Sequence, residues 1–510
     1  MEIKTITIVG GGSSGWMTAA ALAKCTTNIK ITLIESDNIP ILGVGESTLA
    51  QIHEYLTMID VKDKEWMPKC NAVYKTAIRF SNLYLNGSHY NDILAAGPGK
   101  SSTYTVDDFI HLTKIFPDQF AISDFSRFFD DTHSMVEKNK FTNNADRILR
   151  WNIKTEKAYH FDAYMFGQTL KDLVALPNGV HHVVDDVTDI VVNDDNSIKS
   201  LTTRNNGEII SDLYIDCTGF EALLIGKKQD VKFYDFSDQL LNDRAVVANI
   251  PYVDKNVELE SWTDCRVMNS GWLWNIPIWD RIGTGYVYSS KYITDDEALK
   301  EFKQELEKKY GTRVQNITPK FIKFKPGVRE KSWFKNTVAI GLSGGFLEPL
   351  RSTGLLVTHT AIIKLVDVLT RNNNVIKNID KEIFSAEMVD CLQGFKEFVL
   401  AQYVFARKID TPYWSAASNI NFGKDSFWVR NLSDINRNRH YPNNREAVNI
   451  RLLTGSNYNY IPERVNVTEE EKERLVKILN SWQKRKASID NYIDTLPSFY
   501  EFLQKEIYNE

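Results

Sequence analysis

The feature that most constrains the fold is a glycine-spaced turn between a short apolar strand and an alanine-rich helix. Gly10, Gly12 and Gly15 have the spacing GxGxxG, and a second apolar stretch ends at Glu35, 20 residues after Gly15. This is the order of a βαβ unit that binds a dinucleotide, with an acidic residue placed to accept hydrogen bonds from a ribose. The sequence therefore predicts an α/β fold with a Rossmann-like domain.

Each glycine has its own expected role in that turn. Gly10 permits the tight bend, Gly12 lets the backbone approach a pyrophosphate, and Gly15 allows the helix to pack on the strand. The phosphates would then meet free N–H groups at the helix N-terminus. A glycine turn that binds nothing is the alternative, but here the strand, the helix and the acidic residue all stand where a dinucleotide site needs them.

A second glycine-rich segment follows at Gly43 to Thr48. Gly43 and Gly45 flank Val44, and Ser47 with Thr48 is expected to open a helix. The segment is either a loop whose backbone approaches a ligand or an ordinary helix start that Ser47 caps. The pattern alone favours the helix cap.

Composition excludes several classes of protein. The chain has 510 residues, 43% of them hydrophobic, and a net charge of −5, which argues against a disordered chain and against a nucleic-acid partner. No apolar run could span a bilayer, and no export-type cleavage pattern follows the first apolar stretch. The five cysteines are scattered and form neither a metal motif nor a disulfide framework, so we expect a cytoplasmic protein without a structural metal.

Two later segments are ambiguous when judged by pattern alone. Residues 73–80 alternate as a strand, with Lys75 on the face of Ala77 and Arg79, which favours a solvated lysine. The stretch "NSGWLWNIPI" places Trp272 and Trp274 on one strand face, where most tryptophans simply pack in a core.

A third glycine-rich turn precedes a long helix near residue 354. Its expected N-terminus, at Ser352, Thr353 and Gly354, leaves N–H groups able to hold an anion. Upstream, His160 to Asp162 reads as a strand end that leads into a helix, and further on Thr468 with Glu471 forms a capping box.

The chain shows no repeat and no linker-like run, so we expect one body built from interleaved modules. The expected modules are a dinucleotide-binding module at 1–50, 150–225 and 335–370, a substrate-side module at 51–149 and 226–334, and a mainly helical region at 371–510.

Taken together, these stretches resemble flavin-dependent halogenases of the tryptophan-halogenase family, in the family's order and over most of residues 1–370. The lysine segment and WxWxIP are the more specific motifs. The matching segments are GGGSSGW (10–16), GVGES (43–47), YKTAIRF (74–80), YHFDA (159–163), DCTGF (216–220), WLWNIP (272–277), GLSGGFLEPLRSTG (341–354) and DTPYW (410–414).

The resemblance implies an FADH2-dependent enzyme that needs a separate flavin reductase. In the family, O2 and a halide ion give hypohalous acid at a flavin C4a-hydroperoxide. The oxidant is then relayed through a tunnel to a lysine, here Lys75, which activates it for electrophilic halogenation of an electron-rich aromatic compound. A lysine suits this task because it is a compact donor with a shiftable pKa.

The family's site residues carry over to matching positions. Lys75 and Glu348 are the candidate catalytic residues, and Thr353 and Gly354 would hold the halide through their N–H groups. The candidate barrier between flavin and substrate is Trp272, Trp274, Ile276 and Pro277. The expected FAD contacts are Gly10, Gly12, Ser13, Ser14, Gly15, Glu35, Gly43, Val44, Val187, Ser343 and Gly344.

One departure bears on the substrate. The family commonly has EPLESTG, with a glutamate credited as helper and proton acceptor, whereas this chain has Arg351 there, which cannot act as a base. An electron-rich indole, phenol or pyrrole therefore fits better than free tryptophan. Trp414, Phe427 and Trp428 could form walls for a flat ring, with core packing as the alternative reading.

Two other functions compete with the halogenase. One is an FAD-dependent aromatic hydroxylase that uses NAD(P)H directly, and the other is a flavin-binding protein without turnover. Lys75 and the tryptophan pair favour the halogenase. The sequence leaves both a monomer and a homo-oligomer open.

Overall fold

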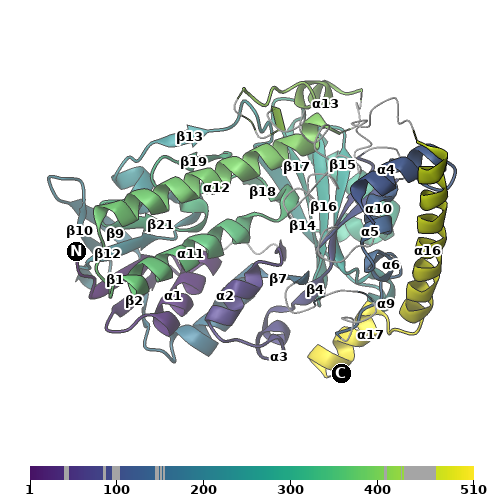
Figure 1. Cartoon of the computed structure of the whole chain (residues 1–510). Coiled ribbons are helices and arrows are strands. Elements are labelled where there is room, and N and C mark those ends of the chain that lie inside the picture. The colour runs from purple at the N-terminus through teal and green to yellow at the C-terminus, as the bar shows by residue number, and fades with distance from the viewer. Residues whose placement is uncertain are drawn as a thin grey trace. The chain divides into compact units, whose positions relative to one another are not determined.

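The computed structural model describes residues 1–38, 45–83, 88–94, 104–143, 149, 152, 156–406, 410–424, 426, 428–429 and 467–509. Gly43, Val44 and Phe427 therefore lie outside the described residues. The chain forms two compact units, each assembled from three segments (Figure 1). The first unit is Met1–Ala72, His160–Ala245 and Phe321–Lys396, and the second is Val73–Tyr159, Val246–Lys320 and Glu397–Glu510.

The first unit contains the predicted βαβ arrangement. β1 (Thr5–Val9) and β2 (Lys30–Glu35) are parallel neighbours, and α1 (Ser13–Cys25) connects them. Their sheet has the order β20-β21-β12-β1-β2-β8. The α/β fold class is confirmed. The remaining strands of this sheet are β8 (His181–Val184), β12 (Leu213–Asp216), β20 (Trp333–Phe334) and β21 (Thr337–Ala339).

Burial explains why α1 is rich in small residues. Eight consecutive residues, from Gly15 to Leu22, are buried, so the helix is enclosed on all sides and not only along one stripe. It contacts α8 (Ala163–Leu170) and α11 (Gly354–Arg371). Alanines let these helices approach closely, which fixes the start of α1 against the sheet.

Smaller sheets complete the first unit. β9 (Val187–Val192), β10 (Ile198–Thr203) and β11 (Gly207–Ile209) form one antiparallel sheet. A second small sheet has the order β13-β19-β22 and consists of β13 (Phe233–Asp235), β19 (Gly327–Arg329) and β22 (Gly345–Phe346).

The expected helix start at Ser47 is wrong. Gly45–Ser47 forms strand β3, which pairs with β7 (Ala158–Asp162), and the helix α2 begins at Ile52. The tertiary pairing with β7 supplies backbone hydrogen bonds that a local pattern cannot reveal. The expected junction after β7 is confirmed, because Asp162 caps α8 by accepting from the Met165 N–H at 2.9 Å.

The second unit is built on a sheet that runs β14-β17-β16-β15-β5-β6. One of its faces packs against α10 (Asp295–Tyr310) in a core that includes Met268, Leu273 and Tyr286. The strands are β5 (Ala77–Ser81), β6 (His89–Ile93), β14 (Arg244–Pro251), β15 (Trp262–Met268), β16 (Gly271–Pro277) and β17 (Arg281–Tyr288).

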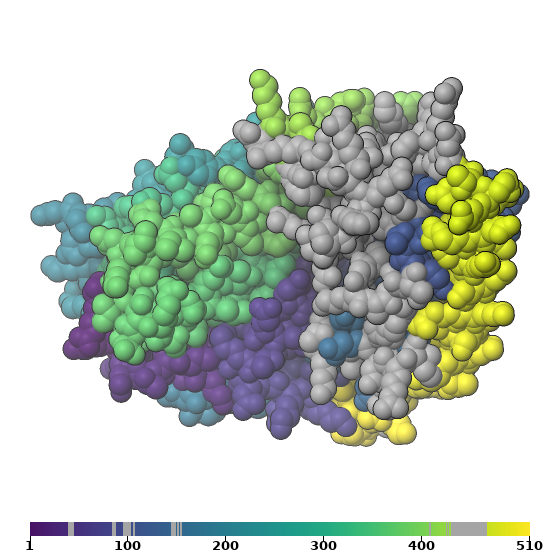
Figure 2. Space-filling view, in the orientation of Figure 1, coloured from purple at the N-terminus to yellow at the C-terminus, as the bar shows by residue number. Residues whose placement is uncertain are grey.

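The C-terminal region carries the predicted helices. α12 (Asn378–Val404), α13 (Pro412–Ala417), α16 (Glu469–Asp494) and α17 (Phe499–Leu503) follow one another. The capping box at Thr468 and Glu471 is confirmed. α16 buries Leu475, Leu479 and Trp482 against aromatic residues around α4 (Val106–Ile115), and it forms the long yellow surface at the right of Figure 2. Within the described residues, every helix is too short or too polar to cross a bilayer.

Candidate functional site

The three motif glycines occupy three different environments in the turn after β1. Gly10 has φ +111°, and a Cβ there would lie 2.3 Å from the Cys217 carbonyl oxygen. A Cβ at Gly15 would lie 1.9 Å from the Gly10 carbonyl oxygen, so both positions exclude a side chain. A Cβ at Gly12 would meet nothing within 4 Å. Open space therefore lies at Gly12, beside the start of α1.

That space suits an anionic group. Gly12 is the N-cap of α1, and no side chain hydrogen-bonds to cap this helix. The N–H groups at a helix start are the usual partners of a phosphate, and the helix dipole adds to the attraction. The residues present thus fit the pyrophosphate of a dinucleotide.

The Glu35 carboxylate lies directly beside this turn. A Cβ on Gly11 would lie only 1.7 Å from Glu35 Oε2. Trp16 Nε1 donates a hydrogen bond to the same oxygen at 3.3 Å, and His182 Nε2 lies 2.6 Å from Oε1. Sequence reasoning placed Glu35 but missed these two partners. They fix the carboxylate at the edge of the open space.

The glycine-rich turn after β21 packs on the start of α1. A Cβ at Gly341, which has φ +80°, would lie 2.3 Å from Ser14 Oγ. The Ser343 hydroxyl donates to the Asp216 carbonyl oxygen and is fully buried. Ser343 therefore ties its turn to the end of β12, and it could contact a cofactor only through its backbone. Gly344 ends the same turn.

Val187 begins β9, in the small sheet with β10 and β11. It packs at the margin of a core cluster that contains Val9, Ile34 and Val183. Because these three residues belong to β1, β2 and β8, Val187 belongs to the same part of the first unit as Glu35.

The start of α11 forms a second site with free helix N–H groups. Ser352 adopts a left-handed conformation with φ +56°, and its hydroxyl donates to Ser47 Oγ at 3.0 Å. Thr353 is the N-cap, and no side chain hydrogen-bonds to cap the helix. Strand β3 thus brings the second glycine-rich segment to the predicted anion site at Thr353 and Gly354.

Glu46, next to Ser47, is a carboxyl group that sequence reasoning missed. Burial raises the pKa of Glu46 to about 7. A carboxyl group that titrates near neutral pH can donate or accept a proton, and such groups are concentrated at functional sites. Its signal in the sequence was its position in the GVGES segment.

Two buried charged residues precede α11. Glu348 is 1% exposed and accepts a hydrogen bond from Asn242 Nδ2 at 2.9 Å. Arg351, the residue that departs from the family pattern, is 2% exposed. Burying a charge costs free energy unless the charge is compensated. Two buried charged side chains in one short segment therefore indicate a functional site.

Lys75 ends β4 (Val73–Lys75) in the second unit and is 0% exposed. The interpretation of Lys75 as a solvated strand lysine is therefore wrong. Its neighbours fix the backbone on both sides: Tyr74 stacks on Phe141 with ring centroids 5.0 Å apart, and the Thr76 N–H donates to the Ser261 carbonyl oxygen at 2.7 Å. Fully buried lysines are rare in proteins.

Trp272 and Trp274 lie side by side on β16, with ring centroids 5.9 Å apart. Trp274 pairs with Gly285 of β17, and a Cβ at Gly285 would lie 2.2 Å from Trp274 Cη2. The Trp274 ring therefore covers the place where a side chain would stand. Within the described residues, the buried Trp272 Nε1 has no hydrogen-bond partner. Ile276 and Pro277 are the last two residues of the strand.

Three aromatic residues, Trp414, Phe427 and Trp428, were suggested as walls for the substrate ring. Trp414 Nε1 donates to the Met268 carbonyl oxygen at 2.7 Å, and Trp428 Nε1 donates to the Glu397 carbonyl oxygen at 3.2 Å. Both indoles are 1% exposed. Packing and internal hydrogen bonds thus favour the core-packing alternative for these two, and Phe427 lies outside the described residues.

His359 of α11 gives a prediction about acid stability. It is 1% exposed, neither ring nitrogen has a hydrogen-bond partner in the described part of the chain, and burial lowers its pKa from 6.5 to about 4. Because the unfolded chain takes up this proton first, the stabilising contribution is present above pH 6.5 and is lost as the pH falls toward 4. When the pH is lowered from 8 to 5, we expect the free energy of unfolding to fall by about 2 kcal/mol more in the wild type than in His359→Leu.

Urea denaturation at the two pH values measures this difference. His181→Leu, at an exposed histidine in the same unit, is the control and should leave the acid dependence unchanged. Equal acid destabilisation of the wild type and His359→Leu would contradict the prediction.

Comparison with known proteins identifies the family. The family described as Tryptophan halogenase matches residues 5–446. The tryptophan 7-halogenase RebH of Lentzea aerocolonigenes is 30% identical over 99% of both chains, and the tryptophan 6-halogenase ThaL of Streptomyces albogriseolus is 32% identical over 81% of this chain and 79% of its own. The chain belongs to the flavin-dependent tryptophan halogenase family.

Solved structures agree over the whole length. The apo structure of VirX1 is 35% identical, with a TM-score of 0.89 over 100% of both chains. The tryptophan 6-halogenase SttH of Streptomyces toxytricini is 28% identical, with a TM-score of 0.84 over 98% of this chain and 99% of its own. The protein is a flavin-dependent halogenase.

Proposed function

We propose that the protein uses FADH2, O2 and a halide ion to halogenate an electron-rich aromatic compound of the indole, phenol or pyrrole type, with Lys75 activating the oxidant. The observation that carries the proposal is the complete burial of Lys75, which a structural strand lysine does not require. Membership of the halogenase family supports the reaction class.

FAD would be held in the first unit. The open space at Gly12 and the uncapped start of α1 suit its pyrophosphate, and Glu35 beside Gly11 suits its ribose. The reduced flavin, when bound, would supply the two electrons that reduce O2 to the level of a peroxide, and the halide would give up the other two electrons to the peroxide oxygen. Every other task falls to the protein: it holds the halide, contains the oxidant, and orients and deprotonates the ring.

The halide ion would bind at the N–H groups of Thr353 and Gly354. The uncapped start of an 18-residue helix favours an anion through its free donors and its dipole. Ser352 turns the chain into this helix with its left-handed conformation, and the hydrogen bond to Ser47 holds that turn.

Lys75 would act on the hypohalous acid, either by donating a hydrogen bond or by forming a haloamine. Both roles need an amine removed from bulk water, which would otherwise compete for the oxidant. The complete burial of the side chain meets that requirement.

The substrate proposal depends on Arg351. A guanidinium group cannot accept the ring proton, so a ring whose cationic intermediate loses its proton readily is favoured over free tryptophan. Arg351 could instead pair with a carboxylate of the substrate. The carboxyl groups of the same unit that could take the proton are Glu348 and Glu46, the latter with a pKa of about 7.

Trp272, Trp274, Ile276 and Pro277 would keep the ring away from the flavin. We expect Gly285→Ala to displace the Trp274 ring, because the added methyl group would overlap Cη2. The change should cost about 1–3 kcal/mol of stability and raise the yield of peroxide relative to halogenated product.

The matched variant is Gly285→Ala combined with Trp274→Phe, in which the smaller ring leaves room for the methyl group. Urea denaturation of the single and double variants should show strong non-additivity. Additive effects on stability would mean that the Trp274 ring does not pack on Gly285.

The proposed function is tested by supplying a separate flavin reductase, FAD, NADH and O2 with chloride or bromide, and a panel of indoles, phenols, pyrroles and tryptophan. Mass spectrometry should detect halogenated products that form faster with the electron-rich rings than with tryptophan. Absence of product from every ring with either halide would refute the proposal. Rapid NADPH oxidation without a reductase would instead indicate the hydroxylase.

A further inference from the structure

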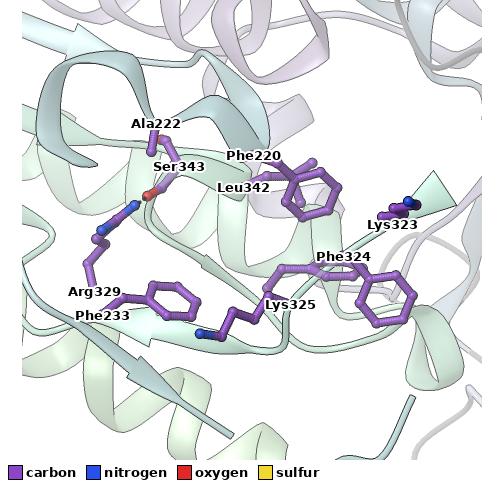
Figure 3. Close-up of a pocket in the computed structure, with 10 residues that line it drawn as sticks. Phe220, Ala222, Phe233, Lys323, Phe324, Lys325, Arg329, Leu342 and Ser343 are labelled. Carbon is purple, nitrogen blue, oxygen red and sulfur yellow. Dashed lines mark hydrogen bonds between the residues drawn. The ribbon is translucent and has the colours of Figure 1, made fainter. Parts of the chain in front are cut away.

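The second unit contains a small cavity that the proposed reaction does not use. It has a volume of about 230 Å³, and strands β5, β6 and β15 and the helix α10 contribute to its lining. A larger cavity of about 510 Å³ lies in the first unit, where Leu342 and Ser343 line it (Figure 3). These two residues belong to the turn that packs on the start of α1, so the larger cavity adjoins the proposed flavin site.

The small cavity lies on the sheet face that the tryptophan pair does not occupy. Cys265 and Trp274 are partners on neighbouring strands, so their side chains point to the same face of the sheet. Asp264 and Arg266, on either side of Cys265, point to the opposite face and line the cavity. The sheet itself therefore separates the cavity from Trp274.

Asp264 is a buried carboxylate with one oxygen open toward the cavity. Its side chain is 4% exposed, and the Ser81 hydroxyl donates to Oδ1 at 2.6 Å. Oδ2 lies 3.7 Å from Arg266 Nη2, too far for a hydrogen bond, and it accepts no other hydrogen bond from the residues that the structure describes. Because a buried carboxylate oxygen without a hydrogen bond is costly, Oδ2 favours a charged donor.

Arg79 supplies a fixed cation on the neighbouring strand. Its guanidinium group stacks on the Trp262 ring, with Cζ 3.9 Å from the ring centroid, and its side chain is 14% exposed. Nε donates to Asn91 Oδ1 and Nη2 donates to Glu137 Oε1, both at 2.9 Å, whereas Nη1 forms no hydrogen bond within the described part of the chain. These contacts hold the guanidinium in place and leave Nη1 available to an anion.

Arg79 and Asp264 are register partners on β5 and β15, where opposite charges would ordinarily attract each other. Among the ion pairs of the described residues, however, Arg79 pairs with Glu137 and Asp264 pairs with Arg266, and the two register partners do not pair with each other. One donor and one acceptor of opposite charge are thus left open on the same cavity. This arrangement matches a ligand that carries both charges.

The other charged groups of the lining have partners of their own. Lys309 Nζ lies 2.9 Å and 3.0 Å from the two carboxylate oxygens of Glu260. Burial raises the pKa of Glu260, Lys309 acts in the opposite direction, and Asp264 raises it further. Arg266 Nη1 donates to Glu305 Oε1 at 3.2 Å, and its Nη2 forms no hydrogen bond with any described residue. The cavity thus presents one open carboxylate oxygen and the guanidinium groups of two arginines.

We propose that this cavity binds a small zwitterion of the α-amino acid class. The ammonium group would donate to Asp264 Oδ2, and the carboxylate would accept from Arg79 Nη1 and Arg266 Nη2. Hydrogen bonds between charged groups are the strong ones in proteins. The volume is below that of cavities for drug-sized molecules, which suits an amino acid with a short side chain. Binding here does not depend on halogenation, since none of these side chains takes part in it.

The probe is L-norvaline, titrated into the full-length protein without flavin or aromatic substrate and followed by ligand-observed NMR. Butylamine has the same propyl chain and ammonium group but lacks the carboxylate, and pentanoate lacks the ammonium group. Norvaline should bind at least about tenfold more tightly than either, because each comparator leaves one charged side of the cavity without a partner. Affinity for either comparator equal to that for norvaline would overturn the proposal.

Two charge variants locate the site by their different effects. Asp264→Asn keeps the size of the side chain and an acceptor for Ser81 but removes the charge, so it should weaken norvaline binding about tenfold without weakening pentanoate binding. Arg266→Gln, at a side chain that is 31% exposed, should weaken norvaline and pentanoate about threefold without weakening butylamine.

The matched controls are Asp296→Asn and Lys300→Gln, at exposed positions of α10 outside the lining, and they should change none of the affinities. Thermal unfolding of all four variants verifies that each is folded at the temperature of the titration. Norvaline affinity that stays at the wild-type value in both Asp264→Asn and Arg266→Gln would place the ligand elsewhere and overturn the assignment.

Discussion

Replacing Lys75 by methionine is expected to reduce halogenation at least about a hundredfold, while FAD binding and peroxide formation continue. Methionine keeps the length and apolar stem of the side chain and removes only the amine, so the fully buried position stays filled. Lys75→Ala should abolish halogenation as well, but it leaves a cavity. The amine is the group that would activate the oxidant, and the methionine side chain has no group that could take its place.

The measurement pairs two readouts from the same reaction with a supplied reductase: halogenated product by mass spectrometry, and peroxide released. The matched control is Lys157→Met, at a second buried lysine of the same unit, 8% exposed, whose Nζ lies 4.1 Å from the centroid of the Tyr74 ring. This control should keep most of the activity. Halogenation by Lys75→Met at the wild-type rate would remove Lys75 from the mechanism.

Gly12→Ala is expected to weaken FAD binding about tenfold to a hundredfold while leaving the fold almost unchanged. A methyl group at Gly12 meets no protein atom within 4 Å, and the backbone there has φ −72°, which alanine adopts readily. The stability cost should stay within about 1 kcal/mol, since alanine is only a poorer N-cap than glycine. The methyl group would occupy the space that the pyrophosphate needs.

Gly10→Ala provides the contrast. Its Cβ would lie 2.3 Å from a backbone oxygen, and φ is +111°, so we expect a loss of about 3 kcal/mol or more. Denaturation midpoints and FAD titrations on both variants separate folding from binding. Normal FAD affinity in a stable Gly12→Ala protein would show that the cofactor's phosphates do not pass this glycine.

Much of the first unit could be predicted from local patterns. The turn at Gly10 to Gly15, the junction at Asp162 and the cap at Thr468 all have causes within a few residues, namely allowed backbone angles and side-chain hydrogen bonds to nearby N–H groups. The predictions that were wrong share a different cause. Ser47 carries an N-cap signal, but its segment forms a strand that pairs with β7. His160, the strand partner of Ser47, lies 113 positions further along the chain.

Partners distant in the sequence escaped prediction for the same reason. His182 and Trp16 flank Glu35, Ser47 meets Ser352, and Gly285 makes room for Trp274. None of these pairs has a periodic or spaced signature, because each forms only when separate elements pack together in the folded chain. The Gly285–Trp274 pair depends on the register of two strands. The pKa of Glu46 is raised by burial, which the local sequence around Glu46 did not indicate.

The sequence by itself determined the α/β class, the dinucleotide-type turn and the family resemblance, because glycine spacing and strand-helix periodicity act over short stretches of chain. Only the tertiary structure decided that Lys75 is buried, that Ser47 lies in a strand, and that Arg79 and Asp264 line one cavity. Burial and charge neutralisation depend on residues far apart in the chain, and so they follow from packing rather than from pattern.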